Sequence, residues 1–177
     1  MKKIIALTLI AVLLAGCGAT TSVKTGLGHD ISIAKSKDAT AEAEGLAQVD
    51  TVMAAVTFDK AGKILGVTID NAQVKVNFDQ NGKVTSDLTE KPETKVELGD
   101  KYGMKKASGI GREWYEQIAE LEKWMTGKTV DQINAMKTVQ KDESHPAVPD
   151  EADLKSKVTV SVESYLAAVT EAYKNAK

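Results

Sequence analysis

The sequence predicts an α+β fold, in which an antiparallel β meander is followed by packed helices in a single domain. Two patterns lead to this prediction. Apolar and polar residues alternate along much of residues 31–86, which is the period of a half-buried strand, and from residue 108 onward apolar residues recur every three to four positions. Strand signals come first and helix signals later, which favours α+β over an alternating α/β fold. A chain of 177 residues suits one such domain.

The N-terminal segment has the order of a secretory signal. Residues 1–3 are basic at two positions, residues 4–14 are apolar except for Thr8, and Leu14-Ala15-Gly16-Cys17 follows. The apolar run is shorter than the ~20 residues that a spanning helix needs. Leu-Ala-Gly-Cys resembles the bacterial lipobox at all four positions, in which the thiol after the cleavage site accepts a diacylglyceryl group. The alternative is an ordinary signal peptide in which the cysteine has no role.

This signal divides the chain into three parts. We expect residues 1–16 to be a signal peptide, residues 17–27 to be the lipidated Cys17 and a flexible tether, and residues 28–177 to be the folded domain. Acyl chains such as palmitate on Cys17 would then hold the exported protein on the cell membrane or the outer membrane without spanning it. Cys17 is the only cysteine, so an intrachain disulfide is excluded.

The strand region contains two clear turn signals. Residues 59–63 (Asp-Lys-Ala-Gly-Lys) separate the Val-rich run 48–58 from the next strand, and Asn81-Gly82 is a strong hairpin signal. We expect strands before and after each turn, with a short return strand from Val84. The apolar residues assigned to the strands between the turns are Ile64, Val67, Ile69, Val74, Val76 and Phe78.

The helical region begins after an irregular, polar stretch at residues 87–107. Apolar residues at positions i, i+4, i+7 and i+11 predict one helix that Gly127 ends, and Thr129 is a suitable N-cap for a short second helix. The first helix has Trp114, Ile118, Leu121 and Met125 on its apolar stripe, and the second has Val130, Ile133 and Met136.

A polar loop at residues 137–152 precedes the last unit of the chain. We expect a short extended piece at Val158 and Val160, and then a helix over residues 162–175 with Ser161 as its N-cap and Glu163 in its first turn. The apolar stripe assigned to this helix consists of Val162, Leu166, Val169 and Tyr173.

Composition narrows the function classes. The net charge is −2, and a weakly acidic chain does not favour sequence-independent nucleic-acid binding, which needs clustered cations. His29 and His145 are the only histidines and neither belongs to a recognisable nucleophile motif, so the sequence does not favour a hydrolase. His145 lies among four carboxylates of the polar loop and Asp153 just after it, but without calcium-loop spacing, so we expect a solvated loop and no metal site.

Hydroxyl groups cluster just before the last helix, at Ser156, Thr159 and Ser161. A helix N-terminus with hydroxyls favours an anion such as phosphate, and the alternative is ordinary capping with a turn. The spacing Asp153, Ser156, Thr159 also resembles the C-terminal signature of FMN-binding domains with covalent flavin. The resemblance implies that Thr159 is esterified to the FMN phosphate, with Asp153 and Ser156 shaping the turn. That family has small residues where this chain has Lys157 and Val158.

A second resemblance covers roughly residues 45–175. Residues 67–70, 94–104 and 111–117 are similar to bacterial membrane lipoproteins of the major membrane immunogen type, which resemble the FMN-binding domain more distantly. It implies an extracytoplasmic domain that receives FMN from a flavin transferase and passes electrons to a redox partner, or a descendant that has lost the flavin. The alternative function is a ligand-binding or surface-interaction lipoprotein with no cofactor. Both functions favour a redox carrier or a binding module over a turnover enzyme, and the sequence leaves enzyme activity open.

The middle of the chain offers a further candidate ligand surface. Tyr102 and Trp114 offer planar faces on which a ring could stack, and the cations nearby would suit a phosphate. The alternative is that Trp114 is a core residue of its helix. The cations are Lys101, Lys105 and Lys106.

Overall fold

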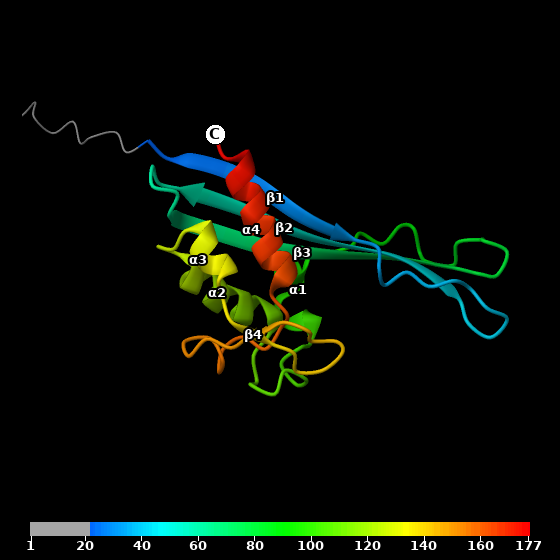
Figure 1. Cartoon of the computed structure of the whole chain (residues 1–177). Helices are drawn as coiled ribbons and strands as arrows, with labels where there is room; N and C mark the ends of the chain where they lie inside the picture. The colour runs from blue at the N-terminus through cyan, green and yellow to red at the C-terminus, as the bar shows by residue number, and fades with distance from the viewer. Residues whose placement is uncertain (1–21) are drawn as a thin grey trace, which may run out of the picture.

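The computed structural model describes residues 22–177, and it confirms the predicted α+β class. Three strands form an antiparallel sheet in the order β1-β2-β3, and the helices lie against one face of it (Figure 1). The elements of the sheet are β1 Lys24–Ser32, β2 Gly45–Phe58 and β3 Ile64–Phe78. The helical elements are α1 Lys95–Leu98, the 3₁₀ helix η1 Gly99–Tyr102, α2 Trp114–Met125, α3 Val130–Asn134 and α4 Glu163–Asn175. The predicted signal peptide and Cys17 lie outside the described residues.

The first strand begins before the predicted domain boundary. The prediction of a tether up to residue 27 was wrong, because β1 starts at Lys24 and pairs with β2 along its whole length. Two of the residues that β1 turns toward the helices are Gly26 and Gly28, so this strand lacks the apolar alternation that marks the others. The C-terminus reinforces it, since the N–H of Thr25 donates to the carbonyl of Lys177 at 3.1 Å.

The two long strands form a hairpin with the predicted turn. Asp59 Oδ1 accepts the backbone N–H groups of Ala61 and Lys63, and Gly62 has the positive φ of 78° that this turn requires. Beyond it, β3 is one strand of 15 residues. The hairpin turn at Asn81-Gly82 is also present, but Val84 makes only a single bridge to Phe78 and no return strand follows.

The core lies between the sheet and the helices. The stripe predicted on α2 is buried, and so are alternate residues of β2. α2 packs against β3, and α4 packs against β1 and β2. Thr129 caps α3 as predicted, with Thr129 Oγ1 accepting the N–H of Gln132. The buried residues that line the two sides are Val52, Ala54, Val56 and Phe58 of β2, and Trp114, Ile118, Leu121 and Met125 of α2.

The start of the last helix differs from the prediction. Ser161 is not the N-cap, because α4 begins at Glu163 and its N-cap residue Val162 offers no side-chain hydrogen bond. Ser161 Oγ instead accepts the N–H of Ala147 at 3.3 Å. The loop that contains Ala147 also holds a two-residue ladder, β4 Thr138–Val139 with β5 Val148–Pro149. The apolar stripe of α4 is correct at Val162 and Val169, while Tyr173 is exposed.

The helix α4 lies directly on the backbone of β1. A Cβ atom at Gly28 would overlap the carbonyl oxygen of Ala168, and one at Gly26 would overlap that of Ala172. Because both obstacles are backbone atoms, no side-chain rotation relieves the overlap. We therefore expect Gly28→Ala to lower the free energy of unfolding by about 3 kcal/mol or more, the upper end of the overpacking range.

Gly66 of β3 provides the matched control. It is exposed, and a Cβ there would have no neighbour within 4 Å. Gly66→Ala should change stability by less than about 1 kcal/mol. Urea unfolding of both variants checks this, and equal effects at the two positions would contradict the packing argument.

Candidate functional site

Thr159 is held against α2 by hydrogen bonds. Its N–H donates to Gln117 Oε1 at 2.8 Å, and its Oγ1 lies 3.2 Å from the same oxygen and 3.3 Å from the carbonyl of Ser108. Gln117 is fully buried, and its Nε2 donates to the carbonyl of Arg112. Thr159 therefore joins the last segment to α2 and to the loop that precedes it.

The other two predicted flavin-site residues lie apart from these hydrogen bonds. Asp153 and Ser156 are exposed on the turn that precedes Thr159, and Asp153 lines a cavity of about 280 Å³ beside Trp124 and Lys128. Within residues 22–177, no hydrogen bond joins Asp153, Ser156 and Thr159 to one another.

The two residues that depart from the flavin signature have structural partners of their own. Lys157 Nζ forms an ion pair with Glu120 Oε2 at 3.1 Å, and Val158 is fully buried in the core. An ester at Thr159 Oγ1 would remove the proton that this hydroxyl shares with Ser108 and Gln117. The residues around Thr159 thus fit a structural hydrogen-bonding role better than a covalent flavin.

His145 pairs with a single carboxylate. Its Nδ1 lies 2.8 Å from Asp142 Oδ1 in a tight turn, and this hydrogen bond holds the pKa of Asp142 below its usual range. Among the described residues, no three His, Cys, Asp or Glu side chains come together where they could hold a metal ion.

Trp114 and Tyr102 enclose a lysine. Trp114 is a core residue whose Nε1 donates to the hydroxyl of Tyr165 at 2.9 Å. Lys95 Nζ lies 4.8 Å from the centroid of the Tyr102 ring and 5.3 Å from that of Trp114. The lysines expected beside these rings, Lys101, Lys105 and Lys106, are exposed. Sequence reasoning missed Lys95, the first residue of a four-residue helix, because nothing local signals its burial.

The ammonium group of Lys95 is in an unfavourable environment. Lys95 is only 8% exposed, and burial, together with repulsion from Lys35 and Lys75, lowers its pKa to about 8. Attraction by Asp50 and Asp70 offsets part of this effect. Within the described residues, Lys95 Nζ makes no ion pair and no hydrogen bond, so the two aromatic rings are its closest favourable contacts.

A polar cavity of about 230 Å³ lies beside Lys95, between the sheet and the first turn of α4. Asp50 in its wall is satisfied: it pairs with Lys35 at 2.9 Å and accepts hydrogen bonds from Gln48 and Gln73. Burial acts to raise the pKa of Asp50, but these partners hold it below the usual value. The lining residues are Asp30, Ser32, Lys35, Asp50, Val52, Asn71, Gln73, Lys95, Ser161, Ser164 and Tyr165.

Asn71 is the unsatisfied group of this cavity. It lies in β3 opposite Val52 and is 6% exposed. Its Oδ1 is buried and has no hydrogen-bond partner among residues 22–177. A buried amide oxygen without a partner costs about 1–3 kcal/mol, so its persistence indicates a site with a purpose beyond stability.

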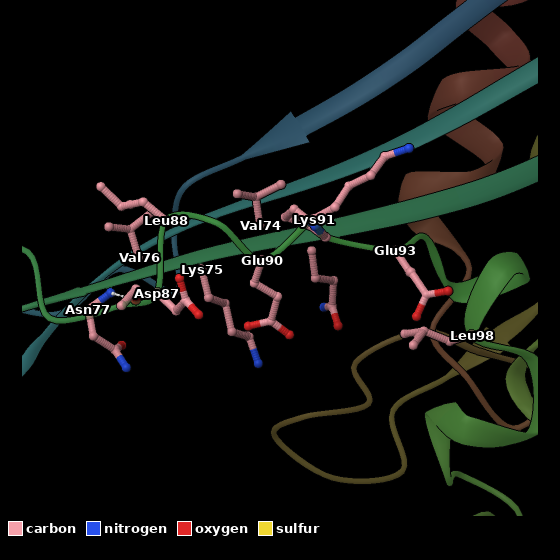
Figure 2. Close-up of a pocket in the computed structure, with 13 residues that line it drawn as sticks. Val74, Lys75, Val76, Asn77, Asp87, Leu88, Glu90, Lys91, Glu93 and Leu98 are labelled. Atoms are coloured by element: carbon pink, nitrogen blue, oxygen red, sulfur yellow. Dashed lines mark hydrogen bonds between the residues drawn. The ribbon is translucent and has the colours of Figure 1, made fainter.

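A larger groove of about 640 Å³ runs between the end of β3 and the segment that follows the hairpin turn. Figure 2 shows that its charged groups do not converge, since Lys75 and Glu90 extend to one side and Lys91 to the other. The segment is fixed by the N–H of Asn77, which donates to Ser86 Oγ at 2.8 Å. The smaller cavity beside Lys95 is therefore the stronger candidate, because it brings buried polar groups together.

Comparison with known proteins gives one curated relative of note. The chain is 30% identical over 112 residues to a chlorophenol reductase of Desulfitobacterium hafniense, an alignment that covers 56% of this chain and 34% of the relative. The chain thus spans about a third of the length of that protein. No family model and no solved structure matches the chain. Among the described residues, none of the helices has the length and apolarity to cross a membrane.

The burial of Lys95 predicts a pH-dependent stability. Its pKa in the folded protein, about 8, is below the ordinary value of 10.5, so between these values the unfolded chain binds more protons than the folded one. The free energy of unfolding should therefore rise from pH 8 toward pH 10, and the unfavourable contribution should be fully present below pH 8. Lys95→Met should stabilise the protein by about 1–3 kcal/mol at pH 7 and remove this rise.

Urea unfolding between pH 6.5 and pH 10 measures both effects. Lys101→Met is the control, because it makes the same change of charge at an exposed position six residues away. A Lys95→Met variant with the pH profile of the unmodified protein would show that Lys95 is not buried as a cation.

Proposed function

We propose that the chain is an exported lipoprotein, anchored by a lipid on Cys17, whose domain is a ligand-binding module. The observation that carries the proposal is the cavity beside Lys95. The ammonium group of Lys95 makes no ion pair or hydrogen bond with the described residues, and the buried amide oxygen of Asn71 in the same lining has no partner among them. Leaving both groups without partners costs free energy in the protein without ligand. A bound ligand that satisfies them would recover this cost, which is the thermodynamic sign of a binding site.

The membrane anchor is supported by the sequence of the N-terminal segment. Leu14-Ala15-Gly16-Cys17 supplies the lipobox pattern, and the lipid chains would contribute ~0.8 kcal/mol for each CH₂ group buried in the bilayer. The proposed location is the exported face of the cell membrane or the outer membrane.

Covalent FMN at Thr159 is the second candidate function. It is favoured by the spacing of Asp153, Ser156 and Thr159 and by the partial exposure of Thr159. The relative described above is a chlorophenol reductase, which also favours it. A bound flavin would supply electron transfer. The chain would then need a flavin transferase and a redox partner, and Thr159 would have to give up its hydroxyl hydrogen bonds.

The anchor is tested at Cys17. We expect Cys17→Ser to move the protein from the membrane fraction to the soluble exported fraction, because serine lacks the thiol that carries the lipid. Thr20→Ser is the control in the same segment and should remain in the membrane. The intact mass of the purified chain checks the lipid directly, and an unlipidated wild-type protein in the membrane fraction would contradict the proposal.

The choice between the two functions is tested at Thr159. We expect the peptide that contains Thr159 to have its unmodified mass, even after co-expression with a competent flavin transferase, because Lys157 and Val158 occupy the positions where small residues let the phosphate approach. If one FMN is added to that peptide, and Thr159→Ala removes it, the redox-carrier function replaces the binding module as the main proposal.

A further inference from the structure

We propose that the cavity beside Lys95 binds a small oxyanion, a carboxylate or a phosphate group. Lys95 Nζ would be its counter-ion, and the first turn of α4 would supply backbone N–H donors. This inference rests on the proposed binding function and names the chemical class of the ligand.

The charge balance of the cavity leaves one cation without a partner. Lys35 and Asp50 neutralise each other at 2.9 Å, and two glutamine amides complete the hydrogen bonding of the carboxylate. The remaining carboxylate of the lining is Asp30 of β1, which is half-buried, whereas Lys95 is almost fully buried. The rings of Tyr102 and Trp114 attract the ammonium group without neutralising it. The lining as a whole is neutral, with two lysines and two aspartates, but an anion in the cavity would give Lys95 the ion pair that it lacks among the described residues.

The first turn of α4 faces the same space. Ser161, Ser164 and Tyr165 line the cavity, and the N-cap residue Val162 has no side chain that could accept a hydrogen bond. The helix has 13 residues, so its free N–H groups and its dipole favour negative charge at this end. Ser161, the predicted N-cap of α4, does not cap the helix, because its Oγ accepts the N–H of Ala147.

Asn71 adds a second polar group to the lining. Its Oδ1 is buried without a partner among the described residues, and the amide N–H₂ group of the same side chain can donate to an oxyanion. A volume of about 230 Å³ restricts the ligand to a small molecule, since it lies below the ~300 Å³ at which drug-sized sites begin.

Calorimetric titration of the full-length chain in detergent tests the inference, with lactate and inorganic phosphate as probes. We expect lactate or phosphate to bind at pH 7. Lactate affinity should fall about tenfold per pH unit above pH 8, as Lys95 loses its proton. The charged and titratable groups around Lys95 are Asp30 of β1, Lys35, Asp50 of β2, Asp70 and Lys75 of β3, Tyr102 and Tyr165.

Three variants separate binding from folding. Lys95→Met should abolish binding although it stabilises the fold, Asn71→Leu should weaken lactate at least tenfold, and Lys101→Met should bind as the unmodified protein does. Equal affinity in Lys95→Met would overturn the inference and leave a binding module with a different site. Failure of wild type to bind either probe would also overturn it. The proposed function is tested by a separate measurement: an added FMN mass on the peptide that contains Thr159 would contradict it.

Discussion

The structure depends on the close backbone contact between α4 and β1. Only glycine at positions 26 and 28 lets the helix approach the strand so closely, and hydrogen bonds at the edges hold it there: Asn175 Nδ2 donates to the carbonyl of Leu27, and the N–H of His29 donates to Glu171 Oε2. This contact seats the last element of the chain on the first one, as Figure 1 shows. It also places the N-terminal end of α4 over the polar part of the sheet and so forms the cavity beside Lys95.

Stability and function oppose each other at this cavity. The core between the sheet and the helices is mostly apolar, whereas the cavity next to α4 is lined by the buried Lys95 and Asn71 and the half-buried Asp50. Tyr165 connects the two regions, because its ring packs in the core and its hydroxyl accepts the Trp114 N–H, while burial raises its pKa to about 12. A fold optimised for stability alone would fill this space with apolar side chains. Binding sites commonly keep polar groups there at a cost in stability.

Local sequence patterns predicted the elements that depend on residues close together in the chain. The apolar stripe from Trp114 to Met125 and the Thr129 cap are correct because a helix and its cap are specified within a few residues. β1 was shortened in the prediction because its buried positions are glycines, which carry no hydrophobic signal. Lys95 was missed because the rings that cover it come from residues 102 and 114 and its cavity from α4. Thr159 was singled out as a flavin attachment point, which stays a prediction. Its hydrogen-bond partner Gln117 is 42 residues away in the sequence, so no local pattern predicts that contact.

The hydrogen bonds between Thr25 and Lys177 place the start of β1 and the end of α4 at the same end of the domain. From Cys17 to Lys24 the chain can extend by at most ~25 Å, at ~3.5 Å per residue, so a lipid on Cys17 would keep that end of the domain near the bilayer. α4 runs from there for 13 residues, or ~20 Å, before it reaches the cavity. The ligand site would therefore lie one helix length from the tethered end of the domain, at the end of α4 away from the lipid.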